Sequence, residues 1–257
     1  MAAWGLDIWM GRTAQVSLGH GAFLAVGAYT SALLSRQGTP WLASLPAALL
    51  VTGALGLVVG HATLRLVGPR LALATLALQV VVEQALTQGG ALTGGAMGLP
   101  MAPAPVLPTA AVVAAGAAAL LWRADRSRLG LAWSGLRHAP TATTAAGVDL
   151  PRLRAWTLAA SAALTGLAGA LMAGQLRLVH PGQFSVDTSL ALLVMVTVGG
   201  VGRVRGPLLG AALVVTLEAA LGPHPLILRA LLGGALLITA LAAPQGLSGR
   251  RPAPSAA

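Results

Sequence analysis

Eight apolar stretches of membrane-spanning length run through this chain and constrain its fold more than any other feature. A helix needs about 20 mostly apolar residues to cross a bilayer. Of the 257 residues, 56% are hydrophobic and only 9% are charged, which disfavours a water-soluble enzyme. We therefore predict an all-α fold, a polytopic transmembrane helix bundle of about eight spans forming a single domain, 1–257. The stretches lie at about 16–35, 41–60, 71–88, 105–122, 155–176, 188–202, 206–222 and 225–243.

Two details modify this segmentation. The sixth stretch is short, so 188–222 is also compatible with one helical hairpin. The run from Trp4 to Met10 looks like the tail of an earlier helix rather than part of a cleaved signal peptide.

The basic residues predict an orientation. All 16 are arginine, and 13 of them fall in segments on one side of the predicted spans. By the positive-inside rule that side is cytoplasmic, so both termini are expected there. The net charge of +10 then reflects topology, and no nucleic-acid partner is expected. The cytoplasmic set is Arg12, Arg65, Arg70, Arg123, Arg126, Arg128, Arg137, Arg152, Arg154, Arg203, Arg205, Arg250 and Arg251; Arg36, Arg177 and Arg229 lie on the other side.

Missing residue types exclude several chemistries. Without lysine the chain has neither a P-loop nor a Schiff base, so any ATP must be bound by another chain. Without cysteine it has no disulfide and no thiolate nucleophile. Its five histidines are scattered without metal-ligand spacing, so neither a metal nor another cofactor is expected. No catalytic motif is visible, which argues against a membrane enzyme.

The longest cytoplasmic segment, about 123–154, has a pattern of its own. Leu129, Trp133 and Leu136 recur at roughly helical spacing. The run 140–147 reads as a short helix that starts at a proline and ends at Gly147, a residue suited to the left-handed cap. The segment is either a solvated loop or a cytoplasmic docking element. The C-terminal tail, 244–257, is expected to be disordered.

A polar stripe marks the third stretch. Thr75, Gln79, Glu83 and Thr87 are four residues apart and share one helical face. A carboxylate at mid-bilayer costs about 2.5–3.5 kcal/mol, so this face should point into the bundle. The stripe either lines a translocation pathway or forms hydrogen bonds between helices.

Polar residues also surround two glycines at the start of the first stretch. Gln15, Ser17 and His20 flank Gly19, where a weakened helix could expose backbone groups to a cavity. The alternative is that they are hydrogen-bonded structure. The candidate pathway residues are Gln15, Ser17, His20, Thr75, Gln79 and Glu83.

Glycine pairs add weaker indications. Gly56 with Gly60, and Gly206 with Gly210, have the small-xxx-small spacing of close helix packing. The glycine- and proline-rich loop 89–105 is expected on the outer face.

Several motifs in combination resemble the LivM-type permease of bacterial branched-chain amino acid ABC importers. The likeness runs from about residue 10 to residue 250. The motifs are Gln15 to Phe23 continuing to Gly27-Ala28-Tyr29, Leu71 to Ala77, Leu92-Thr93-Gly94-Gly95 with Gly98-Leu99-Pro100, Val198 to Gly202, Gly206 to Ala211, and Pro244-Gln245-Gly246-Leu247.

The resemblance implies a location and partners. It implies a multi-pass protein of the bacterial cytoplasmic (inner) membrane that works with a second, LivH-like permease subunit, two cytoplasmic ATP-binding subunits and an extracytoplasmic solute-binding protein. Such permeases usually have at least one further span before the Ser17 motif, so either the true start lies upstream of Met1 or this permease is a shortened one. We expect an in-frame upstream extension that encodes an apolar span. The segment similar to the family's ATPase-coupling region contains Leu136, Arg137, Ala142, Gly147, Arg152 and Arg154.

The expected function is therefore solute translocation driven by ATP hydrolysis on separate subunits, with branched-chain amino acids favoured. An ABC permease of the same family for urea or amides is an alternative. An ion-coupled secondary transporter, with Glu83 as the proton carrier, is a rival from another class.

Overall fold

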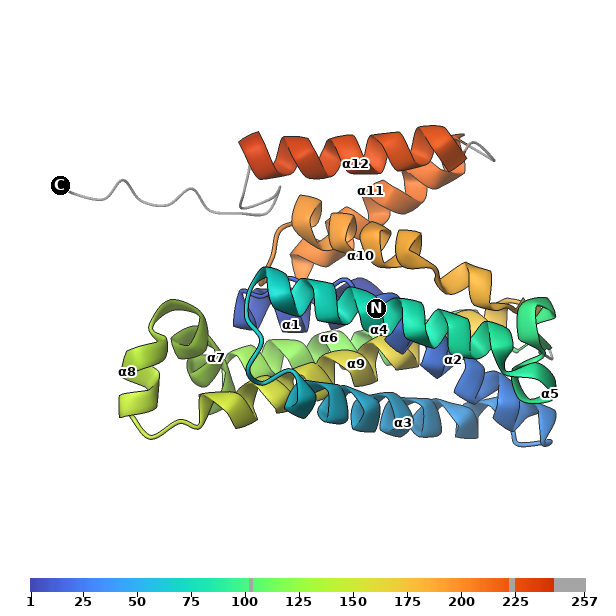
Figure 1. Ribbon diagram of the computed structural model, residues 1–257, viewed down its shortest axis with the longest axis horizontal. Coiled ribbons are helices and arrows are strands. Elements are labelled where there is room, and N and C mark those ends of the chain that lie inside the picture. The colour runs from blue at the N-terminus through green and yellow to red at the C-terminus, as the bar shows by residue number, and fades with distance from the viewer. Residues whose placement is uncertain (102–103, 222–224, 243–257) are drawn as a thin grey trace.

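The computed structural model describes residues 1–101, 104–221 and 225–242, and nearly all of their regular structure is helical. At the centre lies α9 (Leu150–Gln175), which packs against α1 (Ala2–Thr13), α2 (His20–Arg36) and α3 (Trp41–Ala62) (Figure 1). Almost every residue of α1 is buried. These four helices form the core of the bundle.

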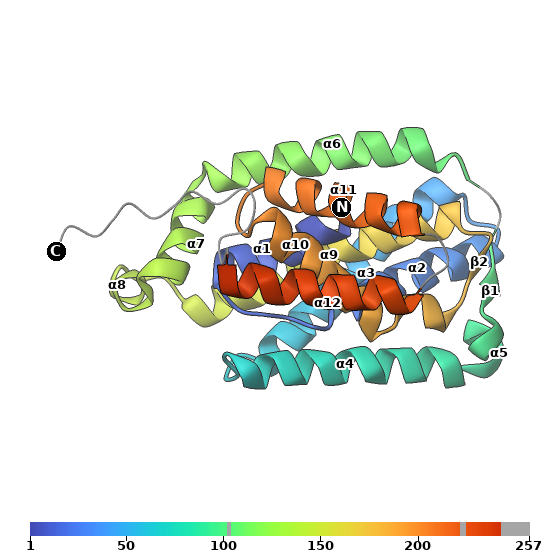
Figure 2. The same ribbon diagram turned by 90° about the horizontal axis from the view of Figure 1, so that it is seen from above.

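The remaining long helices surround this core. α4 (Pro69–Gln88) and α6 (Val106–Asp125) lie along opposite edges (Figure 2). α10 (Val186–Gly199), α11 (Arg205–Leu221) and α12 (Pro225–Ala242) cover one face (Figure 1). Helices α10 and α11 pack directly against each other, as expected for a hairpin.

Short elements close the two ends of the bundle. At one end, α5 (Gly90–Thr93) and the 3-10 turn η1 (Gly95–Met97) lead into β1 (Leu99–Pro100). This strand pairs antiparallel with β2 (Leu178–Val179), Leu99 opposite Val179, and the 3-10 turn η2 (Pro181–Phe184) follows. At the other end, α7 (Arg128–His138) and α8 (Pro140–Ala145) project from the bundle.

Each of the eight predicted stretches forms a helix. α2 begins at His20, later than predicted, and residues 14–19 before it are not helical. α9 begins earlier, because the Asp149 side chain accepts a hydrogen bond from the Arg152 amide and caps it. By length and composition, five described segments can cross a membrane: Trp41–Ala62, Pro69–Gln88, Val106–Asp125, Leu150–Gln175 and Pro181–Gly199.

The start of α1 lies inside the bundle, where Met1 borders a cavity together with Leu24 and Met172. The opposite end of α1 carries Arg12 and Thr13. The tail 244–257, predicted to be disordered, lies outside the described residues.

Glycines allow the core helices to approach closely. A Cβ on Gly56 would lie 2.5 Å from Ala162 Cβ, and one on Gly60 would lie 2.9 Å from Ala155 Cα, so this pair packs α3 on α9 as predicted. A Cβ on Gly210 would meet the Met195 backbone, so the second pair brings α11 onto α10. Gly27 of α2 faces the Gly166 backbone of α9 in the same way.

The α2–α9 approach can be tested with alanine. Gly27→Ala should lower the free energy of unfolding by about 1–3 kcal/mol, because its Cβ overlaps the Gly166 backbone. Gly116→Ala in α6 is the control: its Cβ enters open space, so helix propensity should stabilise that variant by up to about 1 kcal/mol. Unfolding in mixed detergent micelles measures both values, and equal effects would contradict the packing.

Candidate functional site

The first group of predicted residues forms a buried chain of hydrogen bonds at the start of α2. His20 is fully buried, with Nδ1 3.0 Å from Ser17 Oγ and Nε2 2.7 Å from Ser161 Oγ. Ser161 in turn donates to the Gly5 carbonyl at 2.6 Å. These bonds connect α1, α2 and α9.

The predicted residues of α4 extend this network. The Leu18 amide donates to Thr75 Oγ1 at 3.0 Å, and Gln79 donates to the Phe184 carbonyl. The Gly21 amide donates to Ser189 Oγ at 2.9 Å, and Ser189 donates to Gln79 Oε1 at 3.2 Å. Amides in the first turn of a helix have no partner within it. Ser189 accepts from the Gly21 amide at the buried start of α2, and Thr75 accepts from the Leu18 amide just before it.

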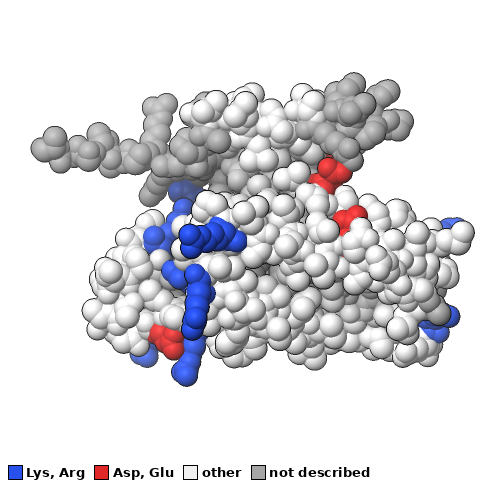
Figure 3. Space-filling view, viewed as in Figure 1, with Lys and Arg blue, Asp and Glu red and all other residues white. Residues whose placement is uncertain are grey.

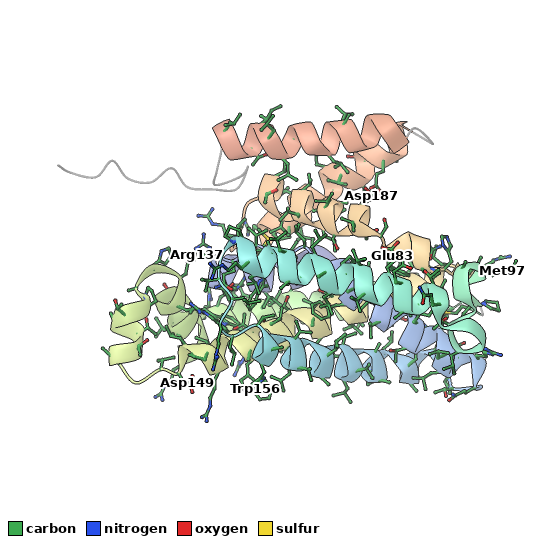
Figure 4. The ribbon with its side chains drawn as sticks, in the orientation of Figure 1. Glu83, Met97, Arg137, Asp149, Trp156 and Asp187 are labelled. Carbon is green, nitrogen blue, oxygen red and sulfur yellow. The ribbon has the colours of Figure 1, made fainter. Side chains whose placement is uncertain are left out.

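The hydrogen bonds favour one of the two interpretations of the polar residues, namely contacts between helices. Ser17, His20, Thr75 and Gln79 are all buried within such contacts. Gln15 is also buried, whereas Glu83 on α4 is half-buried (Figure 4). Their role in a translocation pathway remains a prediction.

A cavity of about 550 Å³ lies between the start of α1, α2, α9, α10 and α11. Most of its lining is apolar, including Leu24, Met172, Leu192 and Met195. Asp187, labelled in Figure 4, and Glu218 add two carboxylates. The chamber can accommodate a small solute that has an apolar body and a cationic group.

The coupling segment predicted from the sequence forms two helices. Ser127 caps α7 by accepting a hydrogen bond from the Leu129 amide, and α8 begins at Pro140. Gly147 follows with a φ of +86°, which confirms the left-handed position. Leu136 is buried with Trp133, whose indole donates to Thr157 Oγ1 at 2.8 Å and holds α7 on α9.

A buried arginine joins this segment to the core. Arg12, at the end of α1, is only 5% exposed. Its guanidinium donates to Asp7 Oδ2 at 2.7 Å and to both Asp125 oxygens at 2.7 and 3.0 Å. Arg137 of α7 donates to the Gly11 carbonyl at 2.5 Å. We call Asp7, Arg12, Asp125 and Arg137 the Arg12 cluster.

The turn between α10 and α11 binds to the same cluster. The Gly202 amide donates to Asp7 Oδ1 at 2.6 Å. Nearby, the Trp4 indole donates to the Val204 carbonyl at 2.7 Å. Gly202 has a φ of +86°, and a Cβ on Gly11 would lie 2.7 Å from its Cα, so glycine is needed on both sides. The cluster thus connects α1, α6, α7 and this turn.

The other residues assigned to coupling lie on the outside. Ala142 and Gly147 are exposed, and Arg152 pairs with Asp149 at 3.1 Å in an exposed ion pair. Arg154 is half-buried. Of this set, the structure brings Leu136 and Arg137 against the core and also buries the Nε atom of Arg154.

The sequence analysis missed Asp7 as a site residue, and also Ser161, Ser189 and Asp187. Asp7 could have been found, because a single acid in the apolar run from Trp4 to Met10 needs a buried partner. The serines carry no such indication. Within the described ranges, no group of three or more histidine, aspartate or glutamate residues could hold a metal ion.

The fold defines a multi-pass α-helical membrane protein, and comparison with known proteins identifies its family. The chain belongs to the family described as branched-chain amino acid transport system / permease component, whose model matches residues 1–241.

Two curated relatives are similar along nearly the whole chain. Both are named high-affinity branched-chain amino acid transport system permease protein LivM, one from Salmonella typhimurium strain LT2 and one from Escherichia coli strain K12. Each is 30% identical over 279 residues, which cover 95% of this chain and 66% of the relative. The chain thus spans less than two thirds of the length of these relatives. No solved structure matches it.

The buried charge of the Arg12 cluster generates a stability prediction. Asp7→Asn should destabilise the protein by about 3–5 kcal/mol, because it leaves a buried guanidinium with less compensation. Asp149→Asn removes an exposed partner of Arg152 and should cost less than about 1 kcal/mol. Detergent-induced unfolding measures both; a loss for Asp7→Asn no larger than for the control would contradict the interpretation.

Proposed function

We propose that the chain is the substrate-translocating permease subunit of an ABC importer for branched-chain amino acids. The observation that carries this proposal is the family match across residues 1–241, supported by the two similar permeases. The cavity suits such solutes, because its apolar lining matches a branched side chain and its carboxylates match an ammonium group.

The proposal includes an orientation. We infer that about eight spans cross the membrane and that the end bearing α7 and α8 faces the cytoplasm. The positive-inside rule supports this, since arginines gather near that end while few lie at the other (Figure 3). The arginine-bearing segments at this end are those that follow α1 and α3, join α6 to α7, precede α9, and join α10 to α11.

The partners follow from the same proposal. A second permease chain completes the pathway, two ATP-binding subunits dock against α7 and α8, and a binding protein delivers solute from outside. The chain lacks a lysine for a P-loop, in agreement with ATP binding by a separate subunit.

Movement of the ATPase subunits then passes into the core through the Arg12 cluster. Arg137 joins α7 to α1, and Asp7 joins α1 to the turn between α10 and α11. Since α10 and α11 border the cavity, a displacement of α7 reaches the chamber through hydrogen bonds of 2.5 and 2.6 Å, from Arg137 to Gly11 and from Gly202 to Asp7.

The cavity predicts a substrate-binding defect. In proteoliposomes with the partner subunits, uptake of labelled leucine should require ATP, and Asp187→Asn should raise its apparent KM about 10-fold, the effect of losing roughly 1.4 kcal/mol. The control is Asp149→Asn, an exposed acid far from the chamber. Uptake driven by a proton gradient without ATP and abolished by Glu83→Gln would favour the secondary transporter, whereas competition by urea would favour the amide permease.

The Arg12 cluster predicts uncoupling. Arg137→Gln removes the bond to the Gly11 carbonyl and should lower leucine uptake per ATP hydrolysed about 10-fold, while membrane insertion and basal hydrolysis remain. Arg65→Gln removes the same charge from an exposed position before α4, outside the coupling segment, and should leave the ratio unchanged. Equal ratios for Arg137→Gln and the unmodified protein would refute transmission through this bond.

A further inference from the structure

An apolar groove of about 300 Å³ lies where the last turn of α6, the start of α7 and the first turns of α9 meet. No charged side chain lines it. Leu120 is 70% exposed and Trp156 is 63% exposed, so the groove opens outward, away from the core (Trp156, Figure 4). Its other lining residues include Ala124, Leu129, Leu153 and Ala160.

On each of the three helices an arginine stands next in sequence to a residue that lines this groove. Arg123 precedes Ala124, Arg128 precedes Leu129, and Arg152 and Arg154 flank Leu153. Arg123 and Arg128 are exposed and form no ion pair within the part of the chain that the structure describes.

The acids beside the groove already have partners. Asp125 is bound by Arg12 at 2.7 Å, and Asp149 by Arg152 at 3.1 Å. The Arg154 Nε atom is buried without a hydrogen-bond partner among the described residues. The rim of the groove therefore carries positive charge that the described chain does not neutralise.

Aromatic side chains indicate the depth of the groove in the membrane. The Arg126 guanidinium lies 3.8 Å from the centre of the Trp122 ring, and Trp122 is 55% exposed. Exposed tryptophans beside arginines are typical of the level of the lipid headgroups. Basic pockets between helices at this level bind anionic headgroups.

We propose that this groove binds an anionic phospholipid. One acyl chain lies against Leu120, Leu129 and Trp156, and the phosphate lies among Arg123, Arg128 and Arg154. An apolar helix from a partner chain fits less well, because it would bury the unneutralised guanidinium groups. The proposal requires only that the protein is in a membrane, so it does not depend on the proposed transport function.

Native mass spectrometry of the purified full chain in detergent tests the site, with phosphatidylglycerol and phosphatidylcholine as probes. The unmodified protein should bind phosphatidylglycerol at least about 10-fold more tightly, since each arginine near the headgroup contributes about 1 kcal/mol. Arg123→Gln/Arg128→Gln should remove most of this preference, because only Arg154 then remains at the headgroup. Arg65→Gln/Arg70→Gln removes two exposed arginines, one before α4 and one in its first turn, on the opposite edge from α6 (Figure 2), and should retain the preference.

The acyl-chain half of the site is tested separately. Ala160→Phe fills the groove and Leu120→Gln makes its wall polar; both positions are exposed, so folding is retained. Each variant should weaken binding of both lipids at least about 3-fold, the effect of losing one buried methylene of roughly 0.8 kcal/mol. A thermal midpoint equal to that of the unmodified protein confirms the fold of each variant.

Four results with the purified chain alone would overturn the proposal. They are equal affinity of the unmodified protein for the two lipids, equal losses in the two arginine pairs, full displacement of the lipid by millimolar inorganic phosphate, and unchanged binding in both groove variants. Protection of the groove by a co-purified second permease chain that excludes phosphatidylglycerol would also overturn it and assign the surface to a protein interface.

Discussion

The neutralisation of one buried guanidinium determines how the two halves of this chain fit together. Arg12 is almost inaccessible to water, so its charge must be compensated by protein. The two carboxylates that compensate it come from positions 7 and 125, and Asp7 also receives the amide of Gly202. Segments that are nearly 200 residues apart in sequence therefore meet at one charge. These segments cannot move relative to one another without exposing the Arg12 guanidinium to water or separating it from its carboxylate partners.

The helices themselves could be predicted from the sequence, because each outer helix carries its own apolar length and its own glycine or proline boundaries. The position of α1 at the centre of the bundle could not be predicted in this way. The run from Trp4 to Met10 lies inside α1, and its position at the centre depends on close approach by α9. The local sequence pattern predicts the length of a helix but does not predict which helices pack against it.

The candidate site divides in the same way. The spacing of Thr75 and Gln79 was sufficient to place them on one inward face, and the structure adds that Leu18 and Phe184 are their partners. Ser161 and Ser189 complete the network, yet isolated serines in an apolar helix have no distinguishing pattern. Likewise, the helices of the coupling segment followed from Pro140 and Gly147, whereas the bond from Arg137 to Gly11 depends on tertiary packing.

The glycines of the core also restrict how the protein can move. Where α2 and α3 meet α9, backbone lies against backbone or against single methyl groups, at Gly27, Gly56 and Gly60. Such contacts contain no long side chain that could change rotamer and accommodate sliding. The three helices therefore act as one stiff block. Relative displacement is least restricted in α12, which packs mainly on α10 and α11, and in α4, which meets the block through α2.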